Sequence, residues 1–203
     1  MTAPPLLVLA GPTATGKTGL AIAVAERLAA QHVPAEIISA DSRQVYRGLD
    51  IGTAKATAEE RRGIPHHGLD LVEPDEPFSV ADFAAHAREA LAGIAARGGV
   101  AILAGGTGLY LRAVGRGIDT AALAHDPATR ARIEAEIERE GIEAAAARLR
   151  ELAPGVAAAT DLRNPRRVAR ALERAELTGD QRPPPPRGYP GPSAWLGLDL
   201  DAA

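Results

Sequence analysis

The sequence of 203 residues predicts an α/β fold with a parallel, doubly wound sheet. In the first half of the chain, short apolar runs with the length of buried strands alternate with segments of helical composition. This alternation favours parallel strands, because each parallel pair needs a crossover and helices commonly supply it. After about residue 115, consecutive charged helices replace the alternation, which indicates an α-helical insert in the core.

Each of the three predicted strands of the core is a run of five mostly apolar residues that ends at a turn. They cover residues 6–10, 36–40 and 100–104. Residues 18–30 have helical composition and join the first two strands. A longer helix precedes the third strand: Ser79 is its N-cap, Asp82 completes an acidic variant of the capping box, and Gly98 ends it. These elements predict the order β-α-β, then α-β.

Three helices are predicted in the insert. Two of them begin with a capping residue followed by proline, Asp126-Pro127 and Asn164-Pro165, and they run to about residues 140 and 178. The third covers about residues 142–152. The helix after Pro165 carries an apolar stripe at the spacing i, i+3, i+4, i+7, which predicts that this face is buried. The stripe consists of Val168, Ala171, Leu172 and Ala175.

The proline-rich segment 182–192 cannot form a helix or a central strand, so we expect a stiff connector there. Residues 193–198 follow as one more strand that returns to the core. We therefore divide the chain into a core of residues 1–115, a helical insert of residues 116–182, and the connector with its returning strand, residues 183–203.

The composition excludes several classes of protein. The sequence has no cysteine, which excludes disulfides, thiol nucleophiles and cysteine-ligated zinc. The net charge of −3 provides no overall attraction to nucleic acid, so RNA binding would need a local basic patch. No segment has the length of a membrane-spanning helix, and the N-terminus lacks the features of a signal peptide. We expect a cytoplasmic, monomeric protein without a membrane partner.

The segment Gly-Pro-Thr-Ala-Thr-Gly-Lys-Thr at residues 11–18 satisfies the pattern G-x-x-x-x-G-K-[ST] between a predicted strand and a predicted helix. Its glycines let backbone N–H groups converge on phosphate oxygens, and the helix start adds a positive dipole end. Lys17 supplies a mobile cation, and the Thr18 hydroxyl suits Mg²⁺. The pattern predicts a P-loop NTPase-like core with a site for a diphosphate group. This site consists of Gly11, Pro12, Thr13, Ala14, Thr15, Gly16, Lys17 and Thr18.

A phosphate loop by itself does not identify a reaction. NTP hydrolases usually place an aspartate after an apolar strand, but the strand 100–104 is followed by Gly-Gly-Thr-Gly. The acid at a strand end is instead Asp41, at the edge where substrates bind in open α/β sheets. Asp41 can ligate a metal or accept a proton from a nucleophile, and its alternative role is to cap a turn.

Four further segments follow the phosphate loop. They are Ser-Ala-Asp-Ser-Arg-Gln-Val-Tyr-Arg-Gly-Leu-Asp-Ile-Gly-Thr-Ala-Lys at 39–55, Pro65-His66-His67, Gly-Gly-Thr-Gly-Leu-Tyr-Leu at 105–111 and Arg-Val-Ala-Arg-Ala-Leu-Glu at 167–173. Together with residues 11–18, they resemble the tRNA dimethylallyltransferase family, also called tRNA isopentenyltransferases. The segment 39–55 is the most specific of them, because ordinary kinases do not carry it. The similarity extends from about residue 6 to about residue 200.

The resemblance implies transfer of a dimethylallyl group from dimethylallyl diphosphate to N6 of the adenosine just 3′ of the anticodon in tRNA, with release of diphosphate. The phosphate loop would then bind a prenyl diphosphate rather than ATP, which accounts for the missing acid after the third strand. Asp41 would be the base near N6. Lys17, with Mg²⁺ on Thr18, would stabilise the leaving diphosphate. Thr107 is expected to hydrogen-bond at the reaction centre.

The resemblance also implies the anticodon stem-loop of tRNA as a partner. Contacts are expected after the second and third strands and on the arginine face of the last insert helix, with Arg130 on the first insert helix as a further candidate. The expected residues are Asp41, Ser42, Arg43, Gln44, Thr107, Arg130, Arg166, Arg167 and Arg170. An arginine face alone is more often a solvated surface, and it is the family motif beside it that favours RNA contact.

Other functions stay open as alternatives. Family members normally continue beyond the point where this chain ends, so an isopentenyltransferase that acts on free adenine nucleotides is one alternative. A truncated remnant that binds without turnover is another, and ATP binding at the phosphate loop is also open. A small-molecule P-loop kinase is disfavoured by the glycines at 105–108. The early end has three explanations: an artificially truncated chain, a truncated gene product or a naturally minimal enzyme.

Overall fold

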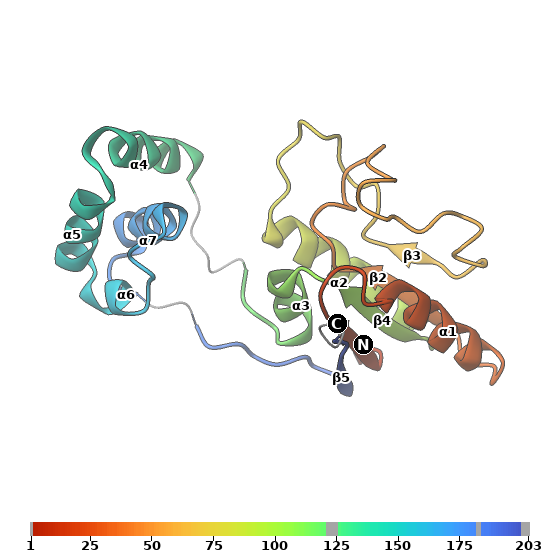
Figure 1. The fold of residues 1–203 in the computed structure, drawn as a ribbon. Coiled ribbons are helices and arrows are strands. Elements are labelled where there is room, and N and C mark those ends of the chain that lie inside the picture. The colour runs from red at the N-terminus through yellow and green to blue at the C-terminus, as the bar shows by residue number, and fades with distance from the viewer. Residues whose placement is uncertain (1, 121–125, 182–183, 200–203) are drawn as a thin grey trace. The chain divides into compact units, whose positions relative to one another are not determined.

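The computed structural model describes residues 2–120, 126–181 and 184–199 (Figure 1). The chain divides into two compact units, which we treat separately. The sheet unit contains the residues before position 121 together with those after position 185, and the helical unit contains the residues between. Arg182 and Pro183, where we expected the connector to begin, lie outside the described residues, as do residues 200–203.

The described part of the sheet unit contains one parallel sheet with the strand order β3-β2-β4-β1-β5. Its strands are β1 (Leu6–Ala10), β2 (Ala35–Ser39), β3 (His66–His67), β4 (Val100–Gly105) and β5 (Ser193–Gly197). In the register of the central strands, Leu103 lies beside both Val8 and Ile38. The predicted α/β fold with parallel strands is therefore confirmed, and the first, second and fourth strands agree with the predicted ones to within one residue.

Helices cover both faces of the sheet, as a doubly wound fold requires (Figure 1). Side chains along the central strands alternate between the faces. Leu9, Ile37 and Ile102 pack with α1 (Lys17–Ala29). Val8, Ile38 and Leu103 pack on the other face with α2 (Val80–Ala96) and α3 (Gly108–Gly115). Phe83 of α2 stacks on Tyr110 of α3, with ring centroids 4.0 Å apart.

The capping box predicted for α2 is present. The Ser79 hydroxyl accepts from the backbone N–H groups of Ala81 and Asp82, and the Asp82 carboxylate accepts from the Ser79 N–H at 2.8 Å. These hydrogen bonds satisfy N–H groups that the first helical turn leaves without partners. None of the helices in the described residues combines the length and apolar character needed to cross a membrane.

The helical unit contains three longer helices and one short one within its described residues. They are α4 (Pro127–Glu140), α5 (Ile142–Leu152), α6 (Pro154–Ala158) and α7 (Pro165–Thr178). Both predicted caps are present, because Asp126 accepts from Thr129 N at 2.8 Å and Asn164 accepts from Arg167 N at 3.2 Å. The predicted stripe on α7 is buried and packs with side chains from the other three helices.

Three elements were not predicted. Helix α3 begins at Gly108, inside a glycine-rich segment that indicated a turn. Helix α6 begins at Pro154, which we expected only to end the helix before it, and proline is well suited to the first helical position. Strand β3 has two residues, too few for a sequence pattern to be visible.

A buried carboxylate connects β2 to its surroundings. Glu36 accepts hydrogen bonds from Arg97 at 2.6 and 3.0 Å, and its Oε2 lies 2.7 Å from Nε2 of His67. Burial acts to raise the pKa of Glu36, but the hydrogen bonds from Arg97 and His67 outweigh it, so the pKa lies below its ordinary value. Glu36 is therefore held ionised between β2, β3 and the end of α2.

Candidate functional site

The phosphate loop connects β1 to α1, as the sequence predicts. Gly16 has a φ of 77° and is the N-cap of α1, and Ala14 also has a positive φ, 68°. The Lys17 ammonium folds back on the loop, where it donates to the Pro12 carbonyl and, at 3.2 Å, to the Thr15 hydroxyl. Burial lowers the pKa of Lys17, and the nearby Asp41 charge opposes this shift. The loop thus carries a cation at the N-terminus of a helix, which suits an anionic group.

A cavity of about 620 Å³ lies beside this loop, and both the loop and the end of β2 contribute to its lining. The predicted site residues that line it are Thr13, Ala14, Gly16, Lys17, Thr18, Asp41 and Gln44. The remaining predicted residues of the sheet unit are not in its lining: Gly11, Pro12, Thr15, Ser42, Arg43 and Thr107. The cavity therefore combines the phosphate-loop cation with the Asp41 carboxylate.

Asp41 and Thr107 are held by short backbone contacts at the ends of their strands. Asp41 Oδ1 accepts from Arg43 N at 2.8 Å, which is the capping role that the sequence left as an alternative. The Thr107 hydroxyl accepts from Ser42 N at 2.9 Å and lies 3.3 Å from the Ser42 hydroxyl. Thr107 thereby positions the residue next to Asp41 rather than lining the cavity itself.

The ends of β2 and β4 approach each other closely at Gly105. A Cβ atom at this position would lie 2.1 Å from the Ala40 carbonyl oxygen, so the approach depends on glycine. The Ala40 carbonyl also accepts from Thr107 N at 3.1 Å. This contact brings Asp41, which follows Ala40, to the glycine-rich turn after β4.

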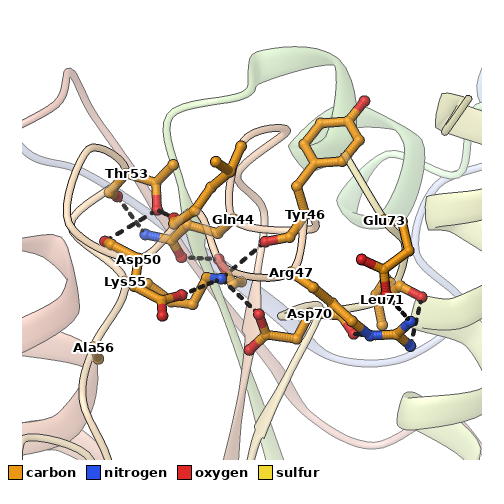
Figure 2. A network of polar contacts seen from close by, with 12 residues as sticks. Gln44, Tyr46, Arg47, Asp50, Thr53, Lys55, Ala56, Asp70, Leu71 and Glu73 are labelled. Atoms are coloured by element: carbon orange, nitrogen blue, oxygen red, sulfur yellow. Dashed lines mark hydrogen bonds and ion pairs between the residues drawn. The ribbon is translucent and has the colours of Figure 1, made fainter. Parts of the chain in front are cut away.

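Gln44 is engaged by the protein itself (Figure 2). Its amide oxygen accepts from the Ser39 hydroxyl at 2.8 Å, and its amide nitrogen donates to the carbonyls of Thr53 and Ala54 at 2.9 and 3.3 Å. Ser39, Thr53 and Ala54 line the cavity together with Gln44. Gln44 thus builds a wall of the cavity, and its contact with tRNA stays a prediction.

The oxygen donors at the cavity fit Mg²⁺ only together with a ligand. Thr18 offers a hydroxyl and Asp41 a carboxylate, and Mg²⁺ is commonly held by one or two protein oxygens with phosphate oxygens and water. Across residues 2–120, 126–181 and 184–199, there is no group of three or more histidine or acidic side chains that could hold a metal ion. A diphosphate would therefore have to complete such a site.

In the helical unit, the predicted arginines fall into two groups. Arg166, Arg167 and Arg170 are exposed on α7, and Arg167 lies 3.7 Å from Asp161. Arg130, only 19 % exposed, instead pairs with the buried Glu173. Burial, with a smaller effect from the Arg170 charge, lowers the pKa of Arg130. Arg130 therefore has a structural role in this unit, while its contact with tRNA stays a prediction.

Several residues of the cavity were missed by sequence reasoning. Thr53 and Ala54 lie within the family-like segment 39–55, so the signal was present but had no assigned role. Ile22 and Ala23 of α1 gave no signal, because they belong to an ordinary apolar helix. Arg62, whose guanidinium lies 3.0 Å from Glu26, comes from a segment without a motif.

Comparisons with known proteins agree with this architecture. The model of the IPP transferase family matches residues 44–187, and that of isopentenyl transferase matches residues 4–73. The tRNA dimethylallyltransferase of Anaeromyxobacter sp. (strain K) is 57% identical over 168 residues, which cover 83% of this chain and 53% of that protein. That of Bifidobacterium longum (strain NCC 2705) is 49% identical over 196 residues, covering 95% and 59%. The chain spans about half the length of the curated relatives it matches.

Two solved structures are also similar. The tRNA isopentenylpyrophosphate transferase of Bacillus halodurans matches with a TM-score of 0.55 and 45% identity, over 86% of this chain and 56% of that one. A eukaryotic dimethylallyltransferase acting on tRNA matches with a TM-score of 0.73 and 26% identity, over 97% of this chain and 48% of that one.

Proposed function

The chain belongs to the IPP transferase family, and we propose that it transfers a dimethylallyl group from dimethylallyl diphosphate to N6 of the adenosine 3′ of the anticodon in tRNA. The observation that carries this proposal is the cavity itself. It combines the Lys17 cation of a phosphate loop with the Asp41 carboxylate, while a glycine-rich turn follows β4 in place of an acid. A site of this kind suits loss of a diphosphate better than transfer of a phosphoryl group.

In the proposed reaction, the N6 amine attacks the carbon that carries the diphosphate, the carbon–oxygen bond breaks, and diphosphate leaves. The Asp41 carboxylate accepts the proton that N6 loses. Lys17 and the amides of the phosphate loop stabilise the negative charge that develops on the leaving group. Mg²⁺, held by Thr18 and the diphosphate oxygens, would neutralise further charge when bound.

The helical unit supports the RNA side of the proposal. Arg166, Arg167 and Arg170 are exposed on one helix of a chain whose overall charge is −3. We propose that they contact phosphates of the anticodon stem-loop, which would make binding weaken as salt rises. We further expect the protein to act in the cytoplasm as a monomer.

Transfer of labelled dimethylallyl to an unmodified anticodon stem-loop, with AMP in parallel, tests the proposal. Asp41→Asn keeps the oxygen that accepts from Arg43 N but removes the base, so we expect the rate to fall about 100-fold or more with the fold retained. Asp75→Asn is the matched control, because Asp75 is exposed and is not in the cavity lining.

Three results would contradict the proposal. A normal rate in Asp41→Asn would remove Asp41 from the role of base. Label in AMP alone would identify the chain as an isopentenyltransferase that acts on free adenine nucleotides. No label in either acceptor, with a folded protein, would leave a binding function without turnover.

A further inference from the structure

A lysine, Lys55, is buried beside the cavity, and its ammonium donates three hydrogen bonds (Figure 2). The side chain of Lys55 is only 3% exposed. Its ammonium donates to the Tyr46 carbonyl at 2.9 Å, to Asp50 Oδ1 at 2.7 Å and to Asp70 Oδ1 at 2.6 Å. All three protons of the ammonium therefore have partners. The proposed reaction makes no use of this residue.

The charge state of Lys55 follows from these partners. Burial acts to lower the pKa of Lys55, but the hydrogen bonds that its ammonium donates to Asp50 and Asp70 outweigh this effect, so the pKa lies above its ordinary value. Both carboxylates are partly exposed, so water solvates them while they neutralise the buried ammonium. Lys55 is thus held as a buried cation between two carboxylates that come from different segments of the chain.

Lys55 joins two segments that are distant in sequence. Tyr46 bridges to Val72, and Asp70 N donates to the Gln44 carbonyl at 3.1 Å, so residues 44–47 already run beside residues 70–72. Through its hydrogen bonds to Asp50 and Asp70, Lys55 attaches the loop of residues 49–54 to these two segments. At the end of that loop, Lys55 N donates to the Asp50 carbonyl at 3.0 Å, which closes the loop on itself.

The loop held in this way carries part of the cavity wall. The carbonyls of Thr53 and Ala54 accept from the Gln44 amide, and all three residues line the cavity. Ala54 has a φ of 50°, a conformation that a residue with a side chain adopts only when its surroundings hold it there. The orientation of the Gln44 amide therefore depends on a loop that Lys55 keeps in place.

We propose that Lys55 is a positioning residue for the acceptor nucleoside: it holds the 49–54 loop, and the loop orients Gln44 and the Thr53–Ala54 wall. This rests on the proposed function together with the tRNA contact that the sequence predicts for Gln44. The donor side is separate, because the phosphate loop makes its own contacts through Lys17, Pro12 and Thr15. Loss of Lys55 should therefore weaken use of the acceptor and spare the donor.

Amide hydrogen exchange tests the loop directly, without any need for activity. In Lys55→Met, we expect the amides of residues 54 and 55 to exchange about tenfold faster or more, while those of β4 keep their rates and show that the sheet is folded. Arg47→Met is the matched control. Arg47 bridges the same two segments from an exposed position and donates to the carbonyls of Asp70 and Leu71, so we expect these loop amides to change less than about threefold.

Steady-state transfer tests the acceptor. In Lys55→Met, we expect KM for the anticodon stem-loop to rise about tenfold, while KM for dimethylallyl diphosphate and the affinity for inorganic pyrophosphate stay within about twofold. Should Lys55→Met fail to fold, Asp70→Asn weakens one of the three bonds and should show the same pattern at smaller size.

Unchanged exchange of the loop amides would overturn the proposal, and so would faster exchange with an unchanged KM for the stem-loop. An equal rise in the KM of donor and acceptor would also overturn it, because that is the result of a general structural defect. If the unaltered chain neither transfers to the stem-loop nor binds it, the proposed function fails and the acceptor role fails with it. The exchange rates then still decide whether Lys55 holds the loop.

Discussion

The close approach of β4 to β2 at Gly105 leads to a quantitative prediction. A Cβ atom at Gly105 would lie 2.1 Å from the Ala40 oxygen, whereas real Cβ atoms keep at least 3.0 Å, so the backbones must separate by roughly 0.9 Å. Two hydrogen bonds share the displaced backbone, Ala40 N to Ala104 O at 2.8 Å and Thr107 N to Ala40 O at 3.1 Å. Overpacking costs about 1–3 kcal/mol and each weakened bond up to about 1 kcal/mol, so we expect Gly105→Ala to destabilise by about 3 kcal/mol.

The neighbouring glycine is the matched control. A Cβ atom at Gly106 would lie 3.5 Å from the Gly11 oxygen, which is an ordinary contact, and neither glycine has a positive φ. Both substitutions restrict the unfolded chain equally, so the difference between the two variants isolates the clash. We expect the stability of Gly106→Ala to change by about 0.5 kcal/mol or less, as measured by urea denaturation followed by circular dichroism. Equal midpoints for the two variants would refute the close approach.

The same substitution should affect the site. Asp41 directly follows Ala40, so a shift of the β2 end carries its carboxylate with it. A misplacement of about 1 Å in a catalytic group can lower a rate about 100-fold, and we expect a loss of this order in Gly105→Ala at a temperature where it is folded. A normal transfer rate in a folded Gly105→Ala protein would show that Asp41 tolerates the shift or has no part in the reaction.

Two further predictions concern buried carboxylates. Glu173→Ala leaves the half-buried Arg130 without its acidic partner, so we expect the free energy of unfolding, measured by urea denaturation, to fall by about 3–5 kcal/mol. Glu140→Ala, at an exposed pair, should lower it by less than about 1 kcal/mol, and similar losses in the two variants would refute the structural role of Glu173. Burial opposes the ionisation of Glu36, but the hydrogen bonds from Arg97 outweigh this effect, so the pKa of Glu36 in the folded protein lies below its ordinary value of 4.5. The ionised carboxylate therefore stabilises the fold above pH 4.5, and this contribution is lost as the pH falls below that value. The urea concentration at the denaturation midpoint should therefore decrease when the pH is lowered from about 6 to about 3.5, and it should decrease by less in Glu36→Gln. An equal decrease in the two proteins would contradict this prediction.

The sequence predicted the core elements well because their signals are local. A five-residue apolar run before a glycine, a capping serine with an acid three residues later, and proline after a capping residue each act through near neighbours. Accordingly β1, α2, α4 and α7 lie where these patterns predicted them. The phosphate loop was equally accessible, since the pattern of residues 11–18 is continuous in sequence and forms the single connection between β1 and α1.

The sequence could not predict which tertiary neighbours two residues of the same type would meet. Gly105 and Gly106 are adjacent and chemically identical, yet only Gly105 faces another backbone at 2.1 Å. Lys17 and Lys55 both follow a family-like pattern, but one lies on a phosphate loop and the other is bonded to acids that come from residues 50 and 70. These differences depend on which distant segment is the neighbour.

By itself, the sequence therefore determined the fold class, the phosphate loop and the family-like segments of this protein, because each depends on residue types at short, regular spacing. Only the tertiary structure decided that Asp41 and Lys17 share a cavity, that Gln44 is part of its wall, and that Arg130 is paired internally. Those outcomes depend on the register of parallel strands and on helix packing, which bring together side chains from distant parts of the chain.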